Sequence, residues 1–140
     1  MAVVVDVRGV SKVYASERGP VSALKNFSMT VEEGDFVAIV GPSGCGKTTL
    51  LWGLTGLHPF SGGEALMLGS PMSAPRKDIG IIFQQANLLP WRNLEQNILF
   101  PLEIMHEDIG AHRERVKKLL ADVQLDGFEK HYPRELSGGM

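Results

Sequence analysis

The sequence lacks several features that define whole classes of proteins. It contains one cysteine, which excludes an internal disulfide and is typical of a protein in a reducing compartment. No uninterrupted apolar run approaches the roughly 20 residues that a membrane-spanning helix needs. The short apolar run near the N-terminus follows no basic segment and is interrupted by Asp6 and Arg8, so we predict no signal peptide.

The sequence also has no large excess of positive or negative charge. The formal net charge is -2 and the basic residues form no stripe, which argues against nucleic acid as a partner. Hydrophobic residues make up 44% of the chain and charged residues 21%. This composition is typical of one globular domain with a sizeable core. Metal-ligand spacing is absent among the histidines, which we interpret as structural or solvated: His58, His106, His112 and His131.

Apolar patterning predicts strands in the first part of the chain. Residues 3–13 are rich in valine and are closed by Tyr14, and the loosely alternating segment 21–31 is expected to pair with them in antiparallel fashion. Two continuous apolar runs, 36–40 and 79–83, are typical of buried strands in a main sheet. The sequence therefore predicts an α/β protein with an antiparallel appendage at its N-terminus.

The second part of the chain shows helical spacing. Asn93 is a plausible N-cap with Gln96 at the capping-box position, and the helix that follows is expected to kink or break at Pro101. A second amphipathic helix is predicted over 107–123, with its basic residues on a solvated face. Its expected apolar stripe is Ile109, Val116, Leu119, Leu120 and Val123.

The segment 41–48 reads GPSGCGKT and matches the phosphate-binding P-loop pattern GxxxxGK[ST]. It follows the apolar run 36–40 and precedes a helix-like run, which is the context that the motif requires. Glycines let the backbone close around a ligand, successive N–H groups form an anion nest, and the helix start adds its dipole. The alternative is a glycine-rich turn with an ordinary surface lysine. The residues expected to cradle phosphates are Gly41, Pro42, Ser43, Gly44, Cys45, Gly46, Lys47, Thr48 and Thr49.

Two further segments are candidate sites. Gln84 follows the apolar run 79–83, and ligands in open α/β sheets bind at the carboxyl ends of strands. The loop after it contains Leu88, Leu89 and Trp91, which are large apolar residues without periodicity. Near the C-terminus lies the sequence LSGG.

Taken in order, these features resemble the N-terminal part of an ABC transporter ATP-binding subunit. They are Tyr14 after the first strand, GPSGCGKTT, IGIIFQ, LLPW and LSGG. The P-loop is shared by many NTPases. LSGG at this distance after it narrows the choice of family to the ABC transporters. GPSGCGKTT together with LLPWRNLEQNI is similar to the nitrate/sulfonate/taurine importer branch. The resemblance implies a P-loop NTPase fold with a nucleotide-binding core and β subdomain over 1–84, followed by the Q-loop and a helical subdomain with the signature over 85–140.

The resemblance also implies roles for individual residues. Tyr14 would stack on adenine, and the alternative is an ordinary aromatic at a strand end. Lys47 and Gln84 would act in catalysis, with Thr48 and Gln84 holding Mg²⁺ beside ATP. The loop Gln84–Trp91 would contact transmembrane permease subunits, which places the protein in the cytoplasm on the inner face of the membrane. The signature residues would bind the γ-phosphate held by a second ATP-binding subunit in a head-to-tail homodimer: Ser137, Gly138 and Gly139.

Departures from the family pattern limit the expected activity. Met140 stands where the family usually has glutamine. The family's strand with a metal-binding Asp and a catalytic Glu, and its later switch His, have no counterpart in the sequence. We therefore expect a truncated domain with an incomplete core sheet that does not hydrolyse ATP by itself. The alternatives are a soluble P-loop kinase or phosphotransferase and a non-catalytic nucleotide-binding fragment.

Overall fold

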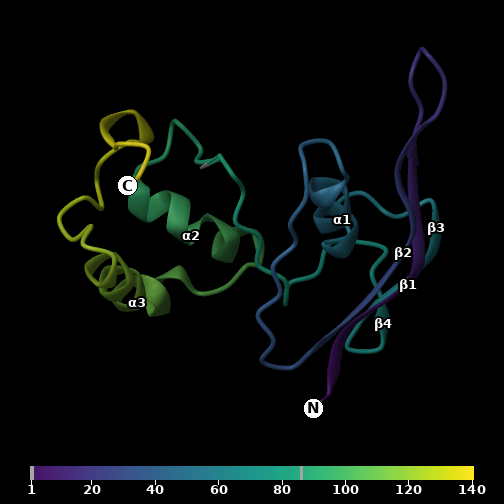
Figure 1. Cartoon of the computed structure of the whole chain (residues 1–140). Coiled ribbons are helices and arrows are strands. Elements are labelled where there is room, and N and C mark those ends of the chain that lie inside the picture. Colours follow the sequence, from purple (N-terminus) through teal and green to yellow (C-terminus); the bar gives the residue numbers. More distant parts are fainter. Residues whose placement is uncertain (1, 86) are drawn as a thin grey trace. The chain divides into compact units, whose positions relative to one another are not determined.

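The computed structural model describes residues 2–85 and 87–140. They group into two units, Met1–Ile81 and Ile82–Met140, whereas the sequence interpretation placed the division at 84/85. The first unit contains a sheet and one helix, and the second contains the remaining helices (Figure 1). In chain order the elements are β1 (Val3–Tyr14), β2 (Val21–Glu32), α1 (Lys47–Leu54), β3 (Gly62–Met67), β4 (Ser70–Pro71), α2 (Leu94–Ile104), α3 (Ile109–Asp122) and the 3-10 helix η1 (Pro133–Glu135).

The first unit is built on a four-stranded antiparallel sheet with the strand order β2-β1-β3-β4. The predicted pairing of the first two strands is confirmed, with a register that ends at Tyr14 opposite Val21. The turn between them projects from the rest of the unit as a long hairpin (Figure 1). β3 pairs with β1 on the side away from β2.

One face of this sheet forms the core of the first unit. The central residues Val7 and Val10 are 1% and 0% exposed. Ala65 and Met72 complete the buried cluster, and Leu54 of α1 is among the side chains packed against it. Burial of such apolar side chains contributes about 25 cal/mol per Å² of surface removed from water. The predicted helix after the P-loop is therefore present and is held to the unit by apolar packing.

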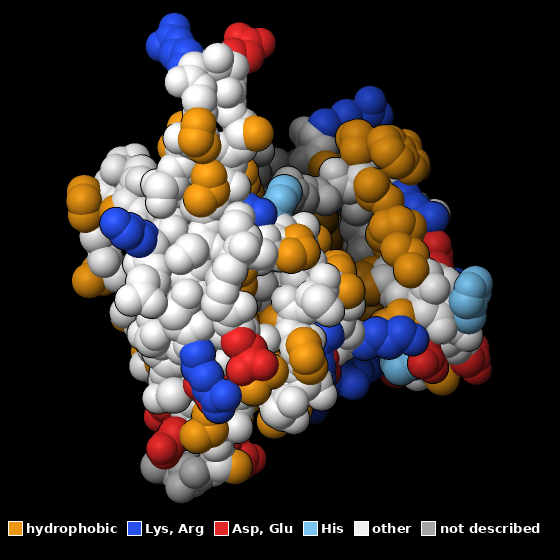
Figure 2. Space-filling model, turned by 90° about the vertical axis from the view of Figure 1, so that its right-hand side faces the viewer, with side chains coloured by type: hydrophobic (Ala, Val, Ile, Leu, Met, Phe, Trp, Pro, Cys, Tyr) orange, Lys and Arg blue, Asp and Glu red, His pale blue; other side chains and the backbone are white. Residues whose placement is uncertain are grey.

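The prediction of two buried strands at 36–40 and 79–83 is wrong. Neither segment is a strand, and Phe36, Val40 and Ile82 are 97%, 87% and 100% exposed. A buried strand needs neighbouring strands that satisfy its N–H and C=O groups. Within residues 2–85 and 87–140 no strand pairs with either segment, so both remain irregular. Figure 2 shows apolar side chains at the surface in several places on one face.

The second unit packs α2 against α3. The predicted capping box is confirmed: the Asn93 side chain accepts from the Gln96 N–H across 2.9 Å, and the Gln96 side chain accepts from the Asn93 N–H across 3.0 Å. Pro101 lies inside α2, which continues to Ile104, so of the predicted kink or break the break is wrong and the kink stays a prediction. The missing N–H of Pro101 leaves the Asn97 carbonyl without its usual donor, but packing on α3 keeps the helix continuous.

The apolar stripe predicted for α3 is only partly buried. Val116 and Leu120 are 4% and 2% exposed and share a core with residues of α2. Leu119 and Val123 are 48% and 62% exposed, so they do not belong to that core. A 3.6-residue period gives a broad stripe, and a single partner helix covers only its centre. No helix in the described part of the chain is long and apolar enough to cross a membrane.

Candidate phosphate-binding site

The P-loop motif forms a turn that leads directly into α1. Gly46 is the N-cap of the helix and has φ 98°, in the left-handed region that glycine adopts without strain. Gly44 also has positive φ, at 81°. The first amides of α1 therefore face the turn and have no partners within the helix, because a helix start leaves its first N–H groups free. This is the arrangement that binds anionic oxygen atoms.

Gly46 is required for a second reason, which is its close contact with the sheet. A Cβ at this position would collide with the carbonyl group of Ala23 and would lie 3.1 Å from Cδ2 of Leu24. Both residues belong to β2. The P-loop therefore rests on the second strand of the hairpin through a position that admits no side chain.

The turn, the start of α1 and β2 enclose a cavity of about 440 Å³. All of its lining residues except Ala23 lie in the P-loop or directly after it, at Thr49. This volume suits the phosphate chain of a nucleotide, and the lining offers amides, hydroxyl groups and one ammonium group. The Thr48 hydroxyl is an oxygen ligand of the kind that Mg²⁺ takes. The lining residues are Ala23, Ser43, Gly44, Gly46, Lys47, Thr48 and Thr49.

The Lys47 side chain folds back over the loop to which it belongs. Its Nζ donates hydrogen bonds to the carbonyl oxygens of Gly41 and Pro42, both at 2.8 Å, and contacts Sγ of Cys45 at 3.7 Å. An ammonium group has three donors. Two of them are directed to main-chain oxygens and the third to the sulfur of Cys45, so the group is held in place at the cavity wall. Sulfur is a weak acceptor, so this third hydrogen bond is the one that a ligand would replace. A Cβ at Gly41 would lie 2.7 Å from the same sulfur, so the loop closes tightly here.

Tyr14 ends β1 but does not line the cavity. The Lys12 ammonium lies 5.2 Å from the centroid of its ring, on the same side of the strand. The Tyr14 hydroxyl is buried and has no hydrogen-bond partner among the residues that the structure describes. The ring is held by packing and a cation–π contact, so stacking on adenine stays a prediction.

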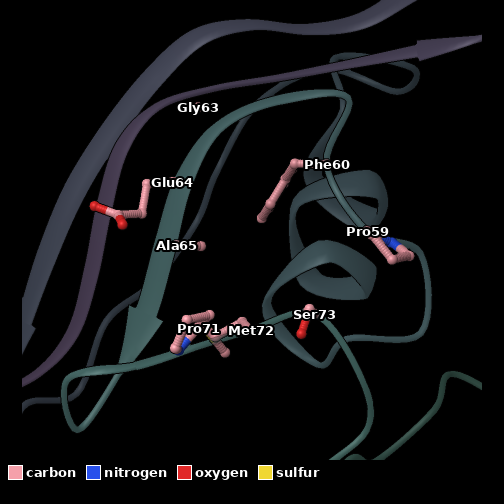
Figure 3. A pocket seen from close by; sticks show the side chains of 8 residues that line it. All are labelled: Pro59, Phe60, Gly63, Glu64, Ala65, Pro71, Met72 and Ser73. Carbon is pink, nitrogen blue, oxygen red and sulfur yellow. The ribbon is translucent and has the colours of Figure 1, made fainter.

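A second cavity in the first unit has a different character. It measures about 190 Å³ and lies between β3 and α1 (Figure 3). Phe60 and Ala65 face its interior, and both also belong to the core packing. The lining contains none of the P-loop residues, and its polar side chains are those of Glu64 and Ser73. We interpret it as a packing defect next to the core.

Gln84 and the loop that follows it lie in the second unit. Gln84 is exposed, and Leu88 and Trp91 are 36% and 70% exposed. Sequence reasoning missed the residue that shapes this loop, which is Asn97 of α2. Its side-chain oxygen accepts from the Leu89 N–H at 2.7 Å, and its Nδ2 donates to three carbonyl oxygens of the loop, those of Leu89, Arg92 and Asn93. Asn97 thereby fixes the loop and presents the Trp91 ring to solvent.

The signature residues form an exposed turn. In the described part of the chain these residues lie in a turn, and a helix start at the signature stays a prediction. The turn is closed by the Met140 N–H, which donates to the Ser137 carbonyl at 3.0 Å. Leu136 anchors it, because this side chain packs against the core of the second unit. The amides of Gly138 and Gly139 are left on the surface of the unit.

Glu95 connects the segments that support the signature turn. Its carboxylate accepts from Lys130 at 2.6 Å and from Arg113 of α3 at 3.4 Å, and the Glu95 side chain is 12% exposed. The hydrogen bond from Lys130 is the main cause that lowers the pKa of Glu95 below its ordinary value, and the nearby charge of Arg113 adds to it. The Glu95 N–H also donates to the Glu129 carbonyl at 3.0 Å.

Comparison with known proteins agrees with this geometry. A cavity built by a P-loop at the start of a helix is the site of a nucleotide-binding cassette. The family model described as ABC transporter matches residues 24–140. The chain therefore belongs to the ABC transporter family. Its fold is similar to that of the ATP-binding cassette MJ0796 in a dimeric post-hydrolysis state bound to ADP and Pi, with TM-score 0.84, 32% identity and coverage of 96% of this chain and 64% of that one.

Two curated relatives show which branch of the ABC transporter family the chain is similar to. The chain is 42% identical over 136 residues to the aliphatic sulfonates import ATP-binding protein SsuB of Bacillus cereus, which covers 97% of this chain and 53% of that protein. It is 44% identical over 131 residues to the taurine import ATP-binding protein TauB of Burkholderia pseudomallei, covering 94% and 50%. The chain thus spans about half the length of the curated relatives it matches.

Proposed function

We propose that this chain binds ATP as part of the energy-coupling subunit of an ABC importer for a sulfonate-, taurine- or nitrate-like solute. The observation that carries the proposal is the cavity of about 440 Å³ around the P-loop, in which Gly46 admits no side chain. The names of the curated relatives support the import of sulfonates or taurine. Selection of the solute would belong to the membrane and receptor subunits.

The residues of the cavity suggest how ATP is held. The amides at the start of α1 and in the turn around Gly44 would donate to the β- and γ-phosphate oxygens. Lys47 would exchange its weak hydrogen bond to Cys45 for one to the terminal phosphates and would contribute its charge. The Thr48 hydroxyl would hold Mg²⁺, which when bound neutralises charge on the phosphates. Tyr14 would stack on adenine.

Hydrolysis would need groups outside this cavity. Gln84 would orient the attacking water near the metal. The turn of Ser137, Gly138 and Gly139 would bind the γ-phosphate held by the second ATP-binding subunit of a head-to-tail homodimer, because exposed amides beside a hydroxyl make an anion nest. The loop Gln84–Trp91 would dock on a permease subunit at the cytoplasmic face of the membrane. Its exposed Trp91 is the type of side chain that such an interface covers.

A second function is supported by one observation. No carboxylate lines the cavity among the residues that the structure describes. A chain with this composition could serve as a nucleotide-binding module without turnover of its own.

The proposal is tested by the binding of MgATP, measured by calorimetry on the wild-type chain and Lys47→Ala. We expect the variant to lose about 2–4 kcal/mol of binding free energy, because it removes one charged contact from a site that the bound phosphates would desolvate. Lys25→Ala, at an exposed position of β2, is the matched control and should bind as the wild type does. Equal affinity of Lys47→Ala and the wild type contradicts the proposal, and so does the absence of binding in both.

A further inference from the structure

The hairpin that supports the P-loop contains an irregularity at Ala23. Lys12 pairs with Leu24, and the next residue of β1, Val13, pairs with Ser22. Ala23 is therefore an extra residue in β2 without a partner in β1, which defines a β-bulge. A bulge bends its strand and turns one residue away from the regular ladder, and such features are common next to functional sites.

The bulge lies against the most restricted point of the P-loop. The Ala23 carbonyl occupies the space into which a Cβ of Gly46 would project. Ala23 is also the one residue of the cavity lining that lies outside the segment 43–49. A regular strand would keep this main-chain group in the ladder with β1. The bulge instead gives the phosphate cavity a wall that faces the start of α1.

The side chain at this position is small, and its size matters. Ala23 is half-buried, and every other residue of the lining belongs to the phosphate turn or to the first turn of α1. Ala23 contacts the site of a Gly46 Cβ through its carbonyl group, and the residue lines the cavity, so we expect a larger side chain here to reduce the space for a ligand. Gly46 cannot shift without changing the turn, because its left-handed φ of 98° is what starts the helix.

We propose that Ala23 is a positioning residue of the phosphate site: the bulge holds Gly46 in its left-handed conformation, and the small side chain leaves room for the phosphate chain. This inference rests on the proposed binding of ATP. The inference adds that Ala23 of β2 contacts the phosphates of the nucleotide and not its base. A triphosphate without a base is therefore expected to be as sensitive to the size of residue 23 as ATP is.

The experiment uses a graded series, Ala23→Gly, Ala23→Ser, Ala23→Val and Ala23→Leu. Binding of MgATP and of magnesium tripolyphosphate is measured by calorimetry. We expect Ala23→Gly to bind both as the wild type does. Ala23→Val should weaken both about tenfold, because a close-packed contact opposes added methyl groups. Ala23→Leu should weaken both further, and by the same factor for the two ligands.

Matched controls separate positioning from damage to the sheet. Ser22→Val adds a side chain of similar size to the neighbouring exposed position, which is paired with Val13. It should leave both affinities unchanged. The NMR amide resonance of Gly46 should shift in Ala23→Val and stay in place in Ser22→Val. Unchanged far-UV circular dichroism shows that a variant is folded. If Ala23→Leu does not fold, Ala23→Ser and Ala23→Val still measure how affinity depends on the size of the side chain.

The outcomes separate this inference from the proposed function. If the wild type binds neither ligand, the proposed binding of ATP fails. If the wild type binds both and the folded Ala23→Val variant binds both equally well, the role of Ala23 is overturned while ATP binding stands. If Ala23→Val weakens ATP alone, the wall faces the nucleoside, and the assignment to the phosphates is overturned.

Discussion

The Lys47 ammonium lies 2.8 Å from the Gly41 carbonyl oxygen, so the lysine of the P-loop closes the turn that carries it. A second hydrogen bond of the same length to Pro42 fixes this position. These two hydrogen bonds within the loop hold the turn in shape. A preformed site loses less conformational entropy when it binds, which favours affinity.

Cys45 offers a direct probe of ligand binding, because it is the one cysteine of the chain and is exposed. Its Sγ lies 3.7 Å from Nζ of Lys47, at the edge of the phosphate cavity. We expect MgATP to slow the alkylation of this thiol, as followed by mass spectrometry over time. Lys47→Ala should lose the protection, since it loses the ligand. Equal labelling rates of the wild type with and without MgATP would place Cys45 outside the bound complex.

Tyr14 tests whether the hairpin contacts the base. We expect Tyr14→Phe to bind MgATP as the wild type does, because the hydroxyl has no hydrogen-bond partner in the described part of the chain. Tyr14→Ala should lose about 1–2 kcal/mol, as expected for loss of an aromatic stack. Calorimetry with magnesium tripolyphosphate is the control, since this ligand has no base to stack. Normal ATP binding by Tyr14→Ala identifies the ring as an ordinary residue at a strand end.

Glu95 is expected to make stability depend on pH. Its pKa in the folded chain is lowered, chiefly by the Lys130 hydrogen bond, so its contribution is present above the ordinary pKa of 4.5 and is lost as the pH falls through the lower folded value. At pH 7, Glu95→Gln should reduce the free energy of unfolding by about 0.5–1 kcal/mol.

Urea denaturation of both proteins at a series of pH values measures this contribution of Glu95. The difference between the wild type and Glu95→Gln should shrink towards zero in acid. Glu114→Gln is a matched control, because its partner Lys117 lies on the same exposed helix face and the pair contributes little. A difference that persists unchanged in acid would assign the effect of Glu95→Gln to packing rather than to charge.

Trp91 tests the proposed docking on a permease. The ring is 70% exposed and is presented by a loop that Asn97 fixes. Trp91→Ala should weaken co-purification with the permease subunit in a full-length subunit that carries the substitution, and should leave MgATP affinity unchanged. Leu57→Ala, which removes a 43% exposed side chain elsewhere, controls for a general loss of apolar surface. An intact complex with impaired ATP binding would reverse the assignment of this loop.

Local signals in the sequence predicted the parts of the fold that depend on neighbouring residues. The capping box at Asn93 and Gln96 is such a case, because both partners lie within one turn of helix. The turn at Gly46 is another, since the motif itself requires a left-handed glycine before a helix. The antiparallel hairpin of β1 and β2 also followed from adjacent segments with valine-rich and alternating patterns.

The errors concern features that depend on distant parts of the chain. The valine- and isoleucine-rich segments 36–40 and 79–83 have the composition of buried strands, but a strand forms only where another pairs with it. Ala23 carries no signal of its own, because its bulge arises from the register between two strands. Asn97 has the appearance of an ordinary surface amide, and its role appears only when the loop before α2 folds over it.

The last prediction concerns turnover by the chain itself. Catalysis of phosphoryl transfer depends on orienting the attacking water and on stabilising charge. In the described residues the cavity has one ammonium group and hydroxyl groups but no carboxylate that could hold the water or the metal. We therefore expect the purified chain to bind ATP and to release no phosphate above the level of Lys47→Ala, across a range of protein concentrations.

The range of protein concentrations is needed because the signature turn would complete a site only in a second subunit. Activity that depended on this turn would therefore rise with the square of the protein concentration. Turnover near 1 s⁻¹, the lower range of working enzymes, would show that a carboxylate of this chain reaches the phosphate cavity.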